Sequence, residues 1–233
     1  MNQEVTLPDT VTNFIAHAIE GALDKTFEPD PLYGPEYSGL QSVLASMQKR
    51  HGHVVNLCIC EAVSLSRFHT VLETGDFYVT NAADRIAEQS LFDGNALPDL
   101  TYGAEPTRRI RLDLAVIDHR TNTVTAYEIK RGNGMLDAGK RRQVMRDMLC
   151  ARMLIKSFAA QQGYKVEAGD AKTIFYYGKR CLPEDFALTG SQLDEHFSFP
   201  VTALVDAGTD HFRDSIKDAI PRLTETALFS QVA

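Results

Sequence analysis

The chain has 233 residues, 44% of them hydrophobic, and a formal net charge of −7 at pH 7. This length predicts one large domain or two small ones. The sequence contains no apolar run near the roughly 18 residues that a membrane span needs. The N-terminus lacks the basic start and apolar core of a signal peptide, so we expect a cytoplasmic protein, and its acidity disfavours broad contact with nucleic acid.

The N-terminal part of the chain has the pattern of two amphipathic helices. The first covers residues 9–24 and the second about 37–49, with a proline-rich loop between them. We expect the second helix to stop near Gly52. Residues 53–72 fit either a long helix or a strand followed by a helix, and the mainly helical alternative is favoured.

Shorter elements follow, and they alternate between strand and helix. We expect a strand at 77–80, a helix at 81–91, a loop at 93–107, strands at 109–118 and 123–131, a helix at 135–160, a strand at 172–177, a helix at 191–197, a strand at 200–205 and a helix at 210–220 closed by Pro221. This order predicts an α/β fold in which helices cover both faces of a mixed β-sheet. We expect a single domain over residues 1–233, with an N-terminal helical extension at 1–50 packed on a core at 51–210.

The strands at 109–118 and 123–131 carry the most informative residues of the chain. A turn at 119–122 would join them as a hairpin. If Asp118 pairs with Thr123, then Asp113 lies opposite Glu128, and their Cβ atoms are about 4.5–5.5 Å apart. Two carboxylates that close repel each other unless a cation lies between them, and a divalent metal is a natural one. Lys130 follows Glu128 by two residues and therefore shares its face.

The same alternation divides the hairpin into two sides. One side is apolar and belongs in a core, and it carries Ile110, Leu112, Leu114, Val116, Tyr127 and Ile129. The acidic side would hold Asp113 and Glu128 among small neighbours such as Ala115 and Ala126. The register is an assumption here, because a slip of one residue would move the acids to the other face.

An acid on one strand followed by Glu-x-Lys on the next resembles the hallmark of the PD-(D/E)XK nuclease superfamily. The match is Asp113 with Glu128-Ile129-Lys130, within a resemblance that spans roughly residues 50–180. The Pro of the family's name is absent, since Arg111 and Leu112 precede Asp113. The resemblance implies a restriction-endonuclease-like core of helix, three strands, helix and strand.

The resemblance also implies a function. Asp113 and Glu128 would bind Mg²⁺ or Mn²⁺, Lys130 would position or activate a water, and the chain would be a nuclease that hydrolyses DNA phosphodiester bonds. Restriction, defence against mobile elements, or repair would be its role. Enzymes of this family often act as dimers because a duplex has two strands, so a homodimer is expected by analogy. An acid from an early helix often completes such sites, and Glu61 is the first candidate.

Basic residues concentrate around the hairpin in the sequence. The set comprises Arg108, Arg109, Arg111, Lys130, Arg131, Lys140, Arg141, Arg142 and Arg146. Cations in the first turns of a helix oppose its dipole, so Lys140, Arg141 and Arg142 are not placed for helix stability. Contact with DNA phosphates is one explanation, and a solvated helix face is the other.

Three alternatives stay open for the motif residues. Asp113 could form an ordinary cross-strand ion pair with Arg111 or Lys130. The fold could serve as a non-catalytic module that binds nucleic acid or protein, or the hairpin could belong to an unrelated α/β protein. The His51, His53, Cys58 and Cys60 cluster does not have the two separated ligand pairs of a zinc site, so free thiols are expected.

Overall fold

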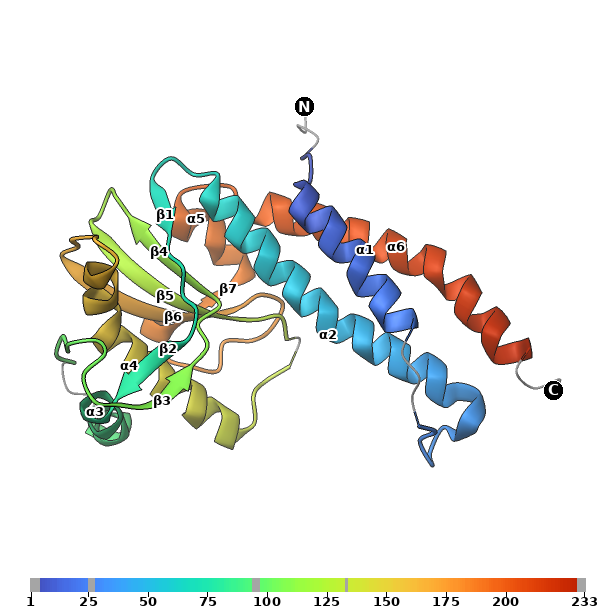
Figure 1. Cartoon of the computed structure of the whole chain (residues 1–233), viewed down its shortest axis with the longest axis horizontal. Helices are drawn as coiled ribbons and strands as arrows, with labels where there is room; N and C mark the ends of the chain where they lie inside the picture. Colours follow the sequence, from blue (N-terminus) through green and yellow to red (C-terminus); the bar gives the residue numbers. More distant parts are fainter. Residues whose placement is uncertain (1–4, 25–27, 94–96, 133, 230–233) are drawn as a thin grey trace. The chain divides into compact units, whose positions relative to one another are not determined.

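The computed structural model describes residues 5–24, 28–93, 97–132 and 134–229 (Figure 1). The chain divides into two compact units. One consists of Met1–Glu61 together with Val201–Ala233, and the other of Ala62–Pro200. Both ends of the chain therefore belong to one unit, and the second unit comes from the continuous middle of the sequence.

The first unit is built from three helices: α1 (Asp9–Leu23), most of α2 (Gly34–Ser64) and α6 (Thr202–Phe229). Helix α1 packs along α6, and Val11 and Ile15 are fully buried. The predicted first helix is confirmed. The described residues include no helix that is both long enough and apolar enough to cross a membrane.

The predicted end of the second helix near Gly52 is wrong, because α2 continues to Ser64. A glycine inside a helix costs about 1 kcal/mol relative to alanine. The buried side chains of Val54, Val55 and Cys58 continue the apolar stripe beyond it. Burial of these residues is worth more than the local cost of the glycine.

The predicted strand at 200–205 is also wrong, because α6 begins at Thr202. Val201, Leu204, Val205 and Phe212 are buried at spacings of three, one and seven residues, which is a helical pattern. Helix α6 then continues past Pro221, the expected end, to Phe229.

The second unit contains a mixed five-stranded sheet in the order β1-β4-β5-β6-β7. Strand β4 is antiparallel to its neighbours β1 and β5, whereas β5, β6 and β7 are parallel to one another. The strands are β1 (His69–Val71), β4 (Leu114–Asp118), β5 (Thr123–Lys130), β6 (Ala168–Phe175) and β7 (Ala187–Thr189). Strands β2 (Phe77–Thr80) and β3 (Pro106–Ile110) form a separate pair. The helices of this unit are α3 (Asn81–Asp93), α4 (Ala138–Gln161) and α5 (Leu193–Phe197).

The predicted pairing of the hairpin is confirmed along β4 and β5, where Asp118 lies opposite Thr123 and Leu114 opposite Tyr127. The single strand expected at 109–118 is instead two strands. Ile110 pairs with Phe77 in the small sheet, and the chain crosses to the main sheet before Leu114. Asp113 is therefore the last residue before β4 and lies outside it.

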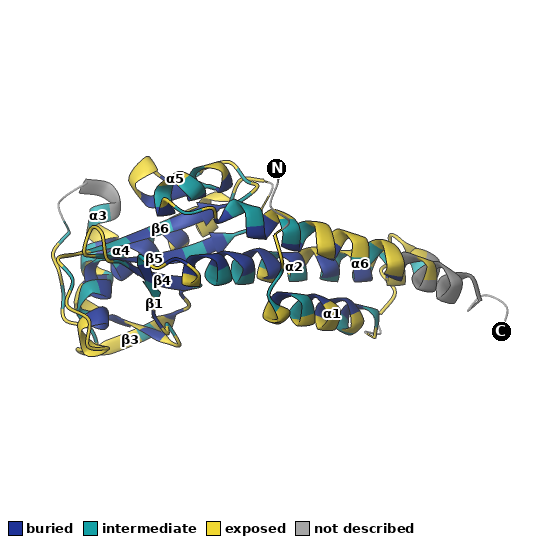
Figure 2. Ribbon diagram, turned by 90° about the horizontal axis from the view of Figure 1, so that it is seen from above, coloured by how far each residue is buried: buried dark blue, intermediate teal, exposed yellow. Residues whose placement is uncertain are grey.

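Both faces of the hairpin are covered, as the buried strands in Figure 2 show. Helix α4 packs on β5 and β6, and Ala115, Ile117 and Ala126 belong to the core beneath it. On the opposite face, the ring of Phe197 in α5 packs against the ring of Tyr127, and the two ring centres are 5.5 Å apart. The small residues Ala115 and Ala126, expected on the acidic side, are buried there and make room for α4.

Candidate functional site

Asp113 lies beside the peptide that joins Glu128 to Ile129. Its Oδ2 atom accepts a hydrogen bond of 2.7 Å from the Ile129 N–H, and its own N–H donates to the Tyr127 carbonyl at 3.0 Å. The hairpin register predicts Glu128 as the partner of Asp113, so this bond goes to the neighbouring residue instead. The Asp113 carboxylate therefore takes the place of a backbone acceptor where β4 begins, which fixes it next to Glu128.

Glu128 places its carboxylate on the face of β5 that α4 covers. The side chain is 17% exposed, and Oε1 forms an ion pair with the Lys130 ammonium. Its Oε2 atom is buried and accepts no hydrogen bond from any residue that the structure describes. Burial raises the pKa of Glu128, the Lys130 charge opposes that rise, and the charges of Asp113 and Asp147 add to it.

Thr173 contributes a second buried polar atom at the same level of the sheet. It lies opposite Glu128 in the parallel pairing of β5 with β6, so the two side chains point to the same face. Its Oγ1 atom is buried and finds no hydrogen-bond partner within the described part of the chain. Two neighbouring buried oxygens without protein partners indicate a place for a water or another small polar group.

Helix α4 brings a further carboxylate to this end of the sheet. Asp147 accepts hydrogen bonds from Arg108 Nη1 at 2.7 Å and from Gln143 Nε2 at 3.0 Å. Arg108 also binds Asp84 of α3 at 2.9 Å. Arg108 thus connects α3, β3 and α4, and it holds the charge of Asp147 within electrostatic reach of Glu128.

The sequence-predicted trio is brought together at the end of β5. Asp113, Glu128 and Lys130 are linked through the Ile129 amide and the Glu128–Lys130 ion pair. Thr173 and Asp147 were not predicted as part of the site. Alternation along β6 could have indicated Thr173, but only once the parallel pairing with β5 was known.

The other predicted residues have other partners or surroundings. Glu61 accepts a hydrogen bond of 2.6 Å from Thr10 of α1, within the first unit. Lys140, Arg141 and Arg142 are exposed in the first turns of α4, where Asp137 caps the helix. Arg141 and Arg142 also line a hollow of about 340 Å³ together with Cys181 and Leu182.

A divalent metal is compatible with the trio. Among the described residues, no group of three or more His, Cys, Asp or Glu side chains is arranged to hold a metal ion. Mg²⁺ is usually bound by only one or two carboxylates and keeps several waters. Asp113 and Glu128 supply two carboxylates, and the unpartnered Glu128 Oε2 is a suitable oxygen ligand.

Comparison with known proteins identifies no relative, since no family model, curated protein or solved structure matches the chain. Assignment of a function therefore rests on the arrangement of the residues themselves.

Proposed function

We propose that the protein is a metal-dependent nuclease that hydrolyses DNA phosphodiester bonds at the end of strand β5. The observation that carries the proposal is the buried Glu128 Oε2 atom, which lacks a partner among the described residues and lies beside Asp113 and Lys130. A buried carboxylate oxygen without a partner is costly, and it is retained where a ligand compensates it.

The order of elements also supports this proposal. The end of α2 is followed by β1, β4 and β5, then by helix α4 and the parallel strand β6. Apart from the intervening β2, α3 and β3, this is the helix, three strands, helix and strand that the resemblance to PD-(D/E)XK nucleases implies. Glu128 and Lys130 lie on β5, and Asp113 directly precedes β4, which is close to the arrangement that the resemblance implies.

The roles of the residues follow from their positions. Asp113 and Glu128 would hold Mg²⁺ or Mn²⁺ between them. When bound, the ion would supply a lowered water pKa and positive charge for the phosphate oxygens. Lys130 is 36% exposed at its side chain, so its ammonium can reach both Glu128 and a group in solvent. It would orient the attacking water and offset charge on the phosphate.

Basic and aromatic groups near the ends of β5 and β6 could hold the DNA. Arg131 directly follows Lys130, and its guanidinium lies 5.6 Å from the ring centre of Tyr177, which is 43% exposed. The exposed Arg141 and Arg142 belong to the helix that follows β5. Such cations bind phosphates, and this local basic surface would offset the acidic net charge.

The test is cleavage of plasmid and single-stranded DNA in the presence of Mg²⁺ or Mn²⁺. We expect cleavage by the wild type and a loss of at least about 100-fold in Lys130→Ala, the scale of a lost charge-stabilising group. Asp113→Asn keeps an oxygen acceptor for the Ile129 N–H but loses the charge, so it should fold and fail to cleave. Lys165→Ala, at an exposed lysine of the same unit, is the control.

Two outcomes would contradict the proposal. Cleavage that survives Lys130→Ala at full rate would show that the activity comes from elsewhere. DNA binding without cleavage by the wild type in either metal would support the alternative of a non-catalytic nucleic-acid-binding module.

A further inference from the structure

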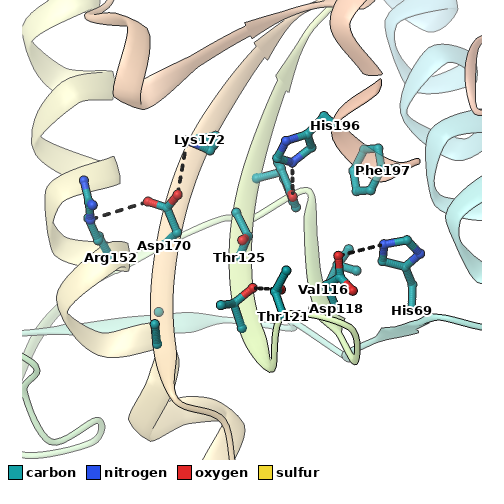
Figure 3. Close-up of a pocket in the computed structure, with 14 residues that line it drawn as sticks. His69, Val116, Asp118, Thr121, Thr125, Arg152, Asp170, Lys172, His196 and Phe197 are labelled. Carbon is teal, nitrogen blue, oxygen red and sulfur yellow. Dashed lines mark hydrogen bonds and ion pairs between the residues drawn. The ribbon is translucent and has the colours of Figure 1, made fainter. Parts of the chain in front are cut away.

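A polar pocket of about 450 Å³ lies on the sheet face opposite Glu128 and Lys130 (Figure 3). Its floor carries Thr125 and Tyr127 of β5, which alternate with the residues that face α4. His196 and Phe197 of α5 form one wall. The volume is within the range of small-molecule sites, and no step proposed for the nuclease site uses these side chains.

The polar lining is expensive for a purely structural sheet face. Asp118, Thr125 and Asp170 occupy this side of three neighbouring elements, whereas Ile117 and Ala171 fill the α4 side of the same strands. Aliphatic residues would pack such a face without the cost of removing polar groups from water. The polar groups of this face border an open pocket instead of a packed core.

The two carboxylates of the pocket, Asp118 and Asp170, already have cationic partners. Arg120 binds Asp118 through two contacts of 2.6 and 3.0 Å and holds the pKa of that carboxyl at about 2. Asp170 lies 3.1 Å from the Lys172 ammonium and 3.4 Å from Arg152 Nε, as the dashed lines in Figure 3 show. A charged ligand would have to disrupt one of these pairs, so the pocket favours an uncharged one.

The remaining groups suit hydroxyls and a ring. The Tyr127 hydroxyl and His196 Nε2 are 2.8 Å apart, and burial lowers the pKa of His196 to about 4, so its imidazole is neutral at pH 7. The hydroxyls of Thr121 and Thr123 lie 2.7 Å apart at the mouth, and each can donate or accept. The His196 ring is partly exposed and offers a face to a flat or ring-shaped molecule, and the buried Phe197 ring packs against it with ring centres 4.9 Å apart.

We infer that this pocket binds an uncharged ring molecule that carries several hydroxyl groups, with a nucleoside and a free sugar as the two sources of that chemistry. The hydroxyls contact the threonine side chains, and the ring lies against His196. The inference does not depend on the nuclease proposal, because the pocket and the Glu128 carboxylate lie on opposite faces of the sheet.

The test measures binding of small-molecule probes to the full chain by NMR chemical shifts and by calorimetry, without added metal. The probes are adenosine, cytidine, ribose and methyl glucoside. We expect one class to bind and to shift the ring signals of His196 and Tyr127. Thr125→Val and Thr123→Val should each weaken binding about tenfold, the effect of one lost hydrogen bond. Thr70→Val, in β1 of the same sheet and outside the pocket lining, should leave it unchanged.

The probes also separate the two sources. Binding of nucleosides alone assigns the ring contact to a base, and binding of the sugars alone assigns it to a pyranose or furanose ring. Three results would overturn the inference. They are no binding of any probe up to about 10 mM, binding that both valine variants retain, and tighter binding of adenosine monophosphate than of adenosine.

Discussion

At the scale of single residues, Glu128 combines a buried carboxyl group with an oxygen atom that lacks a partner among the described residues. Burial raises the pKa of this carboxyl group. Lys130 offsets part of that rise through the other oxygen. A group of this kind makes the native state sensitive to pH.

The pKa of Glu128 is raised on folding from an ordinary value of 4.5, so the native state holds its proton to a higher pH than the unfolded state does. In metal-free buffer we therefore expect the free energy of unfolding to fall as pH rises from about 4.5 through the native pKa, by about 1.4 kcal/mol for each unit of difference. Glu128→Gln should remove this decrease, because its amide does not titrate. Urea unfolding of both proteins from pH 4 to 8 measures it.

Mg²⁺ provides the control for this experiment. A bound cation favours the ionised carboxylate, so saturating Mg²⁺ should lower the pKa of Glu128 and flatten the pH dependence of the wild type only. Equal pH profiles of wild type and Glu128→Gln in metal-free buffer would contradict the assignment of a raised pKa to this residue.

At the scale of elements, the close approach of α6 to α2 depends on a glycine. A Cβ atom at Gly208 would lie 2.6 Å from the Cys58 sulfur, which is fully buried. We expect Gly208→Ala to destabilise the protein by about 1–3 kcal/mol, the usual cost of overpacking. Chemical denaturation followed by circular dichroism measures the change.

A second substitution separates this clash from other effects of alanine. Cys58→Ala removes the sulfur, so the double variant should be more stable than the sum of the two single effects predicts. Additive effects of the two substitutions would show that the helices do not meet at this point.

The sequence predicts most elements, because their patterns are local. The hairpin register from Leu114 to Asp118 follows from alternation and one turn, whereas Asp113 lies outside the paired strands and its N–H bonds to Tyr127 instead of the predicted partner Glu128. The break before Asp113 could not be predicted, because Ile110 and Leu114 are both apolar and in phase although they belong to different sheets. Strands of three residues, such as β1 and β7, are too short to show a period.

Other features of the site depend on contacts between distant segments. Asp147 is an ordinary helical acid in the sequence, and only the packing of α4 and its bond to Arg108 bring its charge near Glu128. The polar pocket on the opposite face combines residues from β1, β5, β6 and α5, which no local pattern links.

At the scale of the whole molecule, the middle of the chain carries its own core. The residues of the core beneath α4 run from Leu72 to Ala187, and all belong to the unit of Ala62–Pro200. We therefore expect a fragment of residues 62–200 to fold alone and unfold cooperatively. Dispersed amide signals in a two-dimensional NMR spectrum and a single denaturation step would establish this.

A second shortened chain tests the unit that contains α1, α6 and most of α2. A chain ending at residue 200 lacks α6, and the buried side chains Val11 and Ile15 of α1 would lose part of their core. We expect the helices of residues 9–61 to lose protection from hydrogen exchange while the sheet keeps its own. Equal protection of the helices of residues 9–61 in this shortened chain and in the full chain would contradict the division into two units.

The pairing of α1 with α6 has a consequence for the order of events on the ribosome. Helix α1 is synthesised before the sheet, whereas α6, which packs against it, is synthesised after the sheet. The sheet can form before α6 has been synthesised. Until then the apolar stripes of the N-terminal helices remain exposed and can bind chaperones. Synonymous codons that slow translation before residue 200 would lengthen this interval and leave the finished protein unchanged.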